Sequence, residues 1–125
     1  MKVEFSNGDI VDRYTILSIK VERVVGNEKK NNVQKEYSVL QQALVEVGLT
    51  EEHELCAALR LVNTRLWEIE DEIRIKEKKK EFDDEFIHLA RSVYIENDER
   101  ARLKREINIM TNSTLVEEKQ YEDYK

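Results

Sequence analysis

The chain has 125 residues, of which 38% are charged and 40% are hydrophobic, with no proline, three glycines and a net charge of −6. This length corresponds to about one domain, and the lack of turn-forming residues favours long helices over sheets. The acidic balance excludes a protein that coats duplex nucleic acid, which needs a broad basic surface. Because no apolar run approaches the roughly 20 residues that cross a bilayer, we expect one cytoplasmic domain, residues 1–125, without a membrane partner.

The first half of the sequence predicts two amphipathic helices. Met1–Phe5 is expected to be a short extended segment, followed by a helix over 9–25 whose apolar residues recur every three or four positions. The polar stretch Asn27–Asn32 predicts a loop. A second helix is expected over 33–47, with Gly48 at the position of a C-cap glycine.

The second half predicts two longer helices and a tail. Thr50, followed by acidic residues, is expected to cap a helix over 51–81 that has an unbroken apolar stripe. An aspartate, Asp83 or its neighbour, is expected to cap the fourth helix over 84–110. Residues 111–125 form an acidic tail that either docks onto a neighbour or stays mobile. The expected fold is therefore an all-α antiparallel bundle of four helices.

The fourth predicted helix has an interrupted apolar face. Its stripe contains Glu96, Asn97 and Arg100 near the middle, where a buried face is normally apolar. Burying an unpaired neutral polar group costs roughly 2–7 kcal/mol. These side chains must therefore meet polar partners inside the protein or face a polar ligand.

Two rows of polar side chains extend this observation. Positions three or four residues apart share one face of a helix. The row on the third predicted helix consists of Asn63, Trp67, Glu70 and Arg74. The row on the fourth helix and the residues beside it include Arg91, Tyr94, Asn97, Asp98, Lys104 and Asn108.

If the two helices are antiparallel neighbours, these rows predict a pocket for a phosphate-bearing, nucleotide-like small molecule. Arginine and lysine bind phosphate, amides orient a ligand, and an aromatic ring stacks on a base. The expected phosphate donors are Arg74, Arg91, Arg100 and Lys104. The orienting amides are Asn63 and Asn97, and the stacking residues are Trp67 and Tyr94. Alternatively, Glu70, Asp71 and Asp98 neutralise the same cations in an internal ion-pair network.

Two further functions compete with ligand binding. Paired carboxylates are similar in spacing to the magnesium ligands of all-α nucleotide pyrophosphatases; they are Glu68, Asp71, Glu72, Glu96 and Glu99. Only this alternative requires a cofactor, Mg²⁺. The other alternative is a structural or interaction bundle that binds no small ligand. The single cysteine, Cys56, has no identifiable catalytic base and is expected in the core.

Four segments of the chain resemble a small uncharacterised family of bacteria and tailed phages. They are GDIVDRYTILSIKVERV, LVNTRLWEIEDEIRIKE, FDDEFIHLARSVYIENDERARLKREIN and LVEEKQYEDY. The resemblance covers nearly the whole chain and places recurring polar residues at Asp12, Thr15, Lys20, Glu22, Asn63, Trp67, Glu70, Asp71, Arg74, Arg91, Tyr94, Asn97, Asp98, Arg100, Lys104 and Asn108. It implies no activity, but it implies a cytoplasmic protein of a bacterium or of a phage-infected host. We therefore expect a homo-oligomer that sequesters a host nucleotide signal without turning it over.

Overall fold

The computed structural model describes residues 1–125 and contains four helices and no strands. Helix α1 spans Asn7–Arg23, α2 spans Asn27–Val47, α3 spans Glu54–Lys79 and α4 spans Asp84–Met110. The all-α bundle expected from the sequence is confirmed. No helix is both long and apolar enough to cross a membrane.

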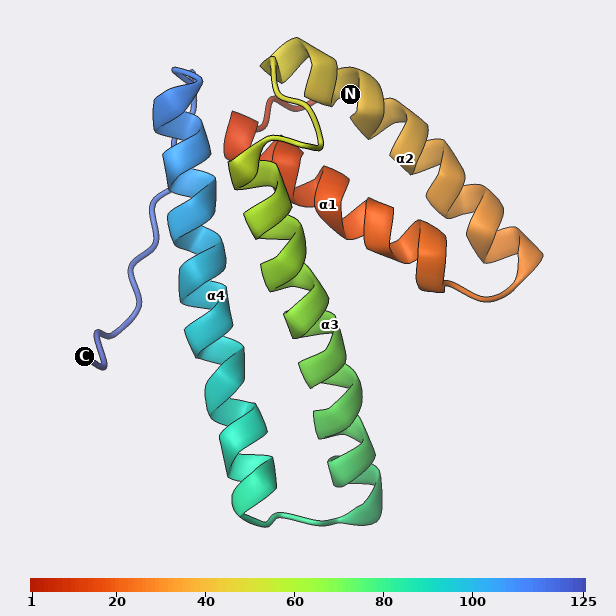
Figure 1. Ribbon diagram of the computed structural model, residues 1–125, viewed down its shortest axis with the longest axis vertical. Coiled ribbons are helices and arrows are strands. Elements are labelled where there is room, and N and C mark those ends of the chain that lie inside the picture. Colours follow the sequence, from red (N-terminus) through yellow and green to blue (C-terminus); the bar gives the residue numbers. More distant parts are fainter.

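Helix α1 is the centre of the bundle. It packs against each of the other three helices, whereas α2 contacts α1 alone and α3 pairs with α4. Figure 1 shows α3 and α4 as a long antiparallel hairpin, with α1 and α2 grouped near one end of it. The core consists of buried side chains from all four helices, including Val11, Leu44, Leu59, Leu103 and Ile107.

The boundaries of α1 and α2 differ from the predicted 9–25 and 33–47. Helix α1 begins at Asn7 because the Ser6 hydroxyl accepts a hydrogen bond from the Asp9 amide at 3.1 Å. The predicted loop Asn27–Asn32 is wrong, since these residues form the first turns of α2. They are polar because this helical end is exposed, and charged side chains such as Lys30 form helices well.

The start of α3 also differs from the predicted 51–81. The predicted Thr50 cap is wrong, because the imidazole of His53 accepts from the Leu55 amide at 3.1 Å and α3 begins at Glu54. The Glu51 carboxylate instead accepts a hydrogen bond from the Tyr14 hydroxyl at 2.7 Å, which ties this turn to α1. Helix α3 ends at Lys79, and Lys80 adopts a left-handed conformation with φ of 57°.

Helix α4 has the predicted bounds, 84–110. The Asp83 side chain accepts from the Phe86 amide at 2.9 Å and caps the helix. A turn at Thr111 and Asn112 follows, and residues 114–125, here called the C-terminal segment, run along α4 on the side away from α3 (Figure 1). Residues 1–5 form neither helix nor strand.

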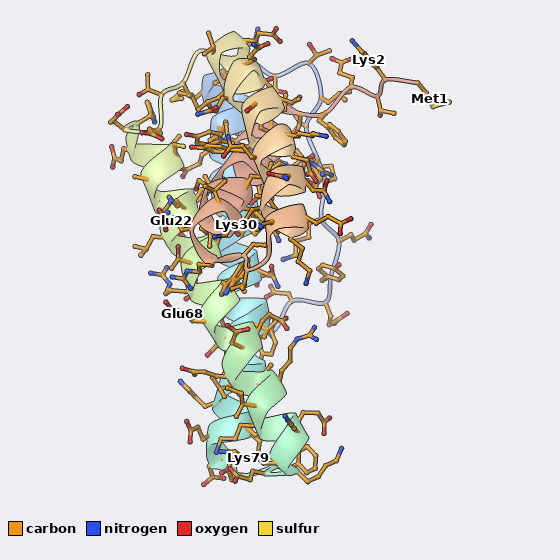
Figure 2. The ribbon with its side chains drawn as sticks, turned by 90° about the vertical axis from the view of Figure 1, so that its right-hand side faces the viewer. Met1, Lys2, Glu22, Lys30, Glu68 and Lys79 are labelled. Carbon is orange, nitrogen blue, oxygen red and sulfur yellow. The ribbon has the colours of Figure 1, made fainter.

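The far part of the α3–α4 hairpin, residues 69–95, is here called the arm. Figure 2 shows α1 and α2 beside the upper part of the hairpin only, with Glu22 above Glu68 and with Lys79 at the far end. The last residue of α1, Arg23, pairs with Glu68 at 3.5 Å, which marks where the cover ends. In the arm, Leu89 is the only buried side chain.

Candidate functional site

A buried polar cluster joins α1, α3 and α4. Asp12 is 1% exposed, and its carboxylate accepts two hydrogen bonds from Arg100, at 2.8 and 2.5 Å. The Asn63 amide donates to Asp12 at 2.9 Å and to the Thr15 hydroxyl at 2.8 Å. We call these four residues the Asp12 network. The paired carboxylate is the main reason that the pKa of Arg100 lies above its usual range.

The Asp12 network accounts for one part of the interrupted stripe on α4, since Arg100 has an acidic partner inside the protein. Glu96 also has a partner: one of its oxygens accepts from Arg65 of α3 at 3.1 Å. The other Glu96 oxygen is buried without a hydrogen bond. Asn97, between them in sequence, lines a groove on the surface of α4.

A close contact fixes the beginning of α1 against α4. The Gly8 amide donates to the buried Asn108 side chain at 2.6 Å. A Cβ atom at Gly8 would lie only 2.3 Å from the carbonyl oxygen of Lys104, so glycine is required for this approach. The Lys104 ammonium group is 3.4 Å from the Asp9 carboxylate of the same α1 turn. This contact holds Lys104 at the edge of the groove.

A groove lies between α4 and the C-terminal segment, and we call it the α4 groove. Its volume is about 1020 Å³. Five of the predicted ligand-binding residues line it: Tyr94, Asn97, Asp98, Arg100 and Lys104. The C-terminal segment adds Lys119, Tyr121 and Tyr124. The groove thus combines three cations, two amides and three tyrosine rings with the carboxylates of Asp98, Glu117, Glu118 and Glu122. Cations and aromatic rings are the groups that bind phosphates and planar bases.

Carboxylates of the C-terminal segment form ion pairs with cations of α4. Glu117 accepts from Lys104 at 2.8 Å, and Glu118 accepts from Arg105 at 3.0 Å. Here the charges are exchanged between the two elements: Lys119 of the C-terminal segment donates to Asp98 of α4. Lys119 and then Tyr124 hold the pKa of Asp98 below its usual range. Alternating charges on α4 and the segment are therefore matched.

The aromatic side of the α4 groove is built from Tyr94 and Tyr124. Their ring centroids are 4.9 Å apart in an edge-to-face arrangement. Arg91 of α4 lies beside them and donates to the Tyr94 hydroxyl at 3.4 Å. Arg91 therefore borders the aromatic pair but does not line the groove.

The other predicted ligand-binding residues lie elsewhere, so the two polar rows do not form one pocket between α3 and α4. Asn63 is buried in the Asp12 network, because α1 covers this part of the hairpin. Glu70 and Arg74 form an exposed pair with each other at 3.1 Å on the arm. Trp67 is half-buried and does not line the α4 groove. Asn63 is hydrogen-bonded to residues of α1, whereas Glu70 and Arg74 lie on the arm beyond the end of α1.

Three of the five carboxylates of the pyrophosphatase alternative are paired with different cations. Glu68 lies 3.5 Å from Arg23, Glu96 meets Arg65, and Glu99 meets Arg102. The structure contains no group of three histidine, cysteine, aspartate or glutamate side chains placed to hold a metal ion. The five acids named from spacing do not converge.

Sequence reasoning missed the contribution of the C-terminal segment to the groove. The alternation of charged and aromatic residues in 117–124 was the available signal, but its partners on α4 depend on how the chain folds back. Asp12 and Thr15 were indicated by the family resemblance alone. A buried aspartate in a helical stripe is the signal that could have identified the network, because such a group requires a partner.

The fold and site define an all-α protein with a buried ion-pair network and a polar, tyrosine-bearing surface groove. The chain belongs to a family of unknown function (DUF6165), whose model matches residues 1–124. Comparisons with curated proteins and with solved structures gave no match.

Proposed function

We propose that this protein binds a phosphate-bearing, nucleotide-like small molecule in the α4 groove and does not turn it over. The observation that carries the proposal is one groove of about 1020 Å³, in which Arg100 and Lys104 of α4 lie with Asn97 and Tyr94. Its lining also includes Lys119, two tyrosines of the C-terminal segment and four carboxylates, which are Asp98, Glu117, Glu118 and Glu122. A volume of this size accommodates a nucleotide-sized ligand. The groove offers groups for both parts of such a ligand.

In this proposal the two groove cations of α4, Arg100 and Lys104, hold the phosphates. Lys104 is positioned by Asp9 and points its ammonium group at the C-terminal segment, where Glu117 now provides the anion. Arg100 uses Nε and one Nη group for Asp12, while its other Nη group makes no hydrogen bond within the protein. Asp12 thus orients the guanidinium, and the remaining Nη group is available to a phosphate oxygen.

Tyr94 of α4 holds the base and Asn97 orients it. Tyr94 offers its ring to the base at the place where Tyr124 now lies against it, and the Asn97 amide supplies both a donor and an acceptor. Stacking on aromatic rings contributes about 1–3 kcal/mol per base in proteins that bind single-stranded nucleic acids. We further propose that the protein is phage-encoded, acts in the host cytoplasm as a homo-oligomer, and sequesters a nucleotide signal.

The test begins with native mass spectrometry of the protein as purified from cells, which detects a nucleotide-sized mass and the number of subunits. Titration calorimetry with ADP-ribose then compares the unmodified protein with Lys104→Ala. Loss of a hydrogen bond to a charged group costs about 1.5–3 kcal/mol, so we expect affinity to fall at least about tenfold. Lys35→Ala, a lysine of α2 with no ion pair, is the matched control.

A second candidate is a structural or interaction bundle without a small ligand. It is favoured by the pairing of Arg100 with Asp12 and of Arg74 with Glu70, which neutralises two predicted phosphate donors within the chain. This candidate predicts no bound mass and no heat of binding, with or without magnesium. Equal affinity in Lys104→Ala and Lys35→Ala contradicts the proposed role of the α4 groove.

A further inference from the structure

The C-terminal segment is attached to the bundle in two different ways along its length. Up to Ser113 the chain is fixed by hydrogen bonds: the Ser113 amide donates to the Asn108 carbonyl at 2.8 Å, and its hydroxyl accepts from the Asn7 amide at 3.0 Å. The Asn7 side chain also donates to Thr111 at 2.9 Å. Beyond Ser113 no backbone hydrogen bond holds the chain to the helices, and every residue is exposed.

The contacts beyond Ser113 are made by side chains with the groups that the proposed ligand would use. Glu117 forms an ion pair with Lys104, and Tyr124 lies against Tyr94 with ring centroids 4.9 Å apart. Glu118 forms an ion pair with Arg105 next to the groove. The segment therefore places carboxylates where phosphates would bind and a ring where a base would stack.

These contacts are of a kind that an anionic ligand displaces. Glu117 and Glu118 are largely exposed, with side-chain exposures of 60% and 76%, and exposed ion pairs are weak and screened by salt. A phosphate group carries more negative charge than a carboxylate and offers more acceptor oxygens. Because Ser113 is anchored, a displaced segment stays close to the groove and can return to it.

We infer that the C-terminal segment is a displaceable strap that competes with the ligand for Lys104 and Tyr94. This inference rests on the proposed function and adds a regulation of the same site. The acidic residues Glu117 and Glu118 act as an internal competitor, and they lower the apparent affinity for weakly charged molecules. A ligand with several phosphates displaces the strap, whereas a neutral nucleoside does not.

The experiment compares two full-length double variants with the unmodified protein. Glu117→Gln with Glu118→Gln removes both strap charges while keeping every residue of the chain. Glu36→Gln with Glu46→Gln makes the same change in net charge on exposed positions of α2, which contacts α1 alone. The probes are ADP-ribose and inorganic pyrophosphate, measured by titration calorimetry at low salt, and circular dichroism checks that each variant is folded.

We expect the strap variant to bind both probes about threefold to tenfold more tightly, while the α2 variant stays within about twofold of the unmodified protein. Saturating ADP-ribose should also accelerate tryptic cleavage after Lys119, because displacement releases this side chain from Asp98. Binding that is equal or weaker in the strap variant overturns the strap and leaves the proposed function standing. Absence of binding in all three proteins overturns the proposed function and the strap together.

Discussion

The same two helices, α3 and α4, are held together differently in two regions. One is the arm, and the other is the part of the molecule that contains α1, α2 and the portion of the hairpin that α1 covers, here called the body. Near the body, α1 lies against both of them and buries Leu59, Leu103 and Ile107 almost completely. In the arm no third helix is present, and Ile75 and Ile87 are about half exposed, at 52% and 53%. The difference shows that helix length alone does not make a core, since burial requires another layer to cover the apolar stripe.

The ion pairs of the body and of the arm also differ in burial. The body buries the Asp12 carboxylate, which is paired with Arg100 and hydrogen-bonded to Asn63. The tip of the arm uses exposed ion pairs, in which Lys76 meets Glu81, Asp83 and Glu85 at 2.9–3.2 Å. We expect changes in the body to affect global unfolding and changes at the tip to affect local opening.

The largest effect is expected from Asp12→Ala. This substitution leaves the Arg100 charge and the Asn63 amide without their partner, and breaking a buried pair costs about 3–5 kcal/mol. Urea denaturation should show this loss in the free energy of unfolding. Glu72→Ala on the arm removes an exposed acid that has no ion pair and should change stability by less than about 0.5 kcal/mol. Equal stability of the two variants would contradict the importance of the network.

Gly8→Ala should have the next largest effect. The added Cβ would meet the Lys104 carbonyl at 2.3 Å, so α1 must move away from α4. Overpacking of this kind costs about 1–3 kcal/mol, although alanine forms helices better than glycine. Thermal unfolding of Gly8→Ala, compared with Asn31→Ala on exposed α2, measures the difference. A Gly8→Ala protein as stable as the unmodified one would show that the helices are not held at this distance.

The smallest effect is a pH dependence confined to the tip of the arm. Hydrogen bonds from Lys76 and from the Phe86 amide lower the pKa of Asp83 below its ordinary value of 3.8. A carboxyl whose folded-state pKa is lowered stabilises the fold above its ordinary pKa, and this contribution is lost as pH falls through the lowered value. Hydrogen-exchange protection of Phe86 should therefore decrease from pH 5 toward pH 3.

The control for this effect is Asp83→Asn, which keeps a capping side chain but removes the titration. The tip of this variant should lose less protection over the same pH range. If Phe86 in both proteins loses protection equally, Asp83 is not the titrating group and the tip opens with the body.

Local sequence signals predicted some helix ends and not others. The aspartate at 83 and the glycine at 48 were predicted as caps, and they occupy these positions in the structure. The end of α2 that was predicted as a loop is helical because its charged residues favour helix without needing a buried face. The start of α3 differs because Glu51 is used by Tyr14, a contact between residues far apart in the sequence.

The candidate site was predictable only in its residue types. The spacing on the fourth helix identified Tyr94, Asn97, Asp98, Arg100 and Lys104 as a polar group, and all five line one groove. It could not indicate that Asn63 belongs to a different environment, because its hydrogen bonds are made with residues of α1 about 50 positions away. It also could not place Lys119 and Tyr124 against α4.

The sequence by itself determined the helical class, because periodic apolar residues and the lack of proline act within each segment. It also determined that the middle of α4 must be polar. Only the tertiary structure decided which polar groups are buried and which are accessible. The reason is physical: α1 occupies one face of the α3–α4 hairpin and seals Asp12, Asn63 and Thr15 inside, while the other polar face of α4 meets only the exposed C-terminal segment.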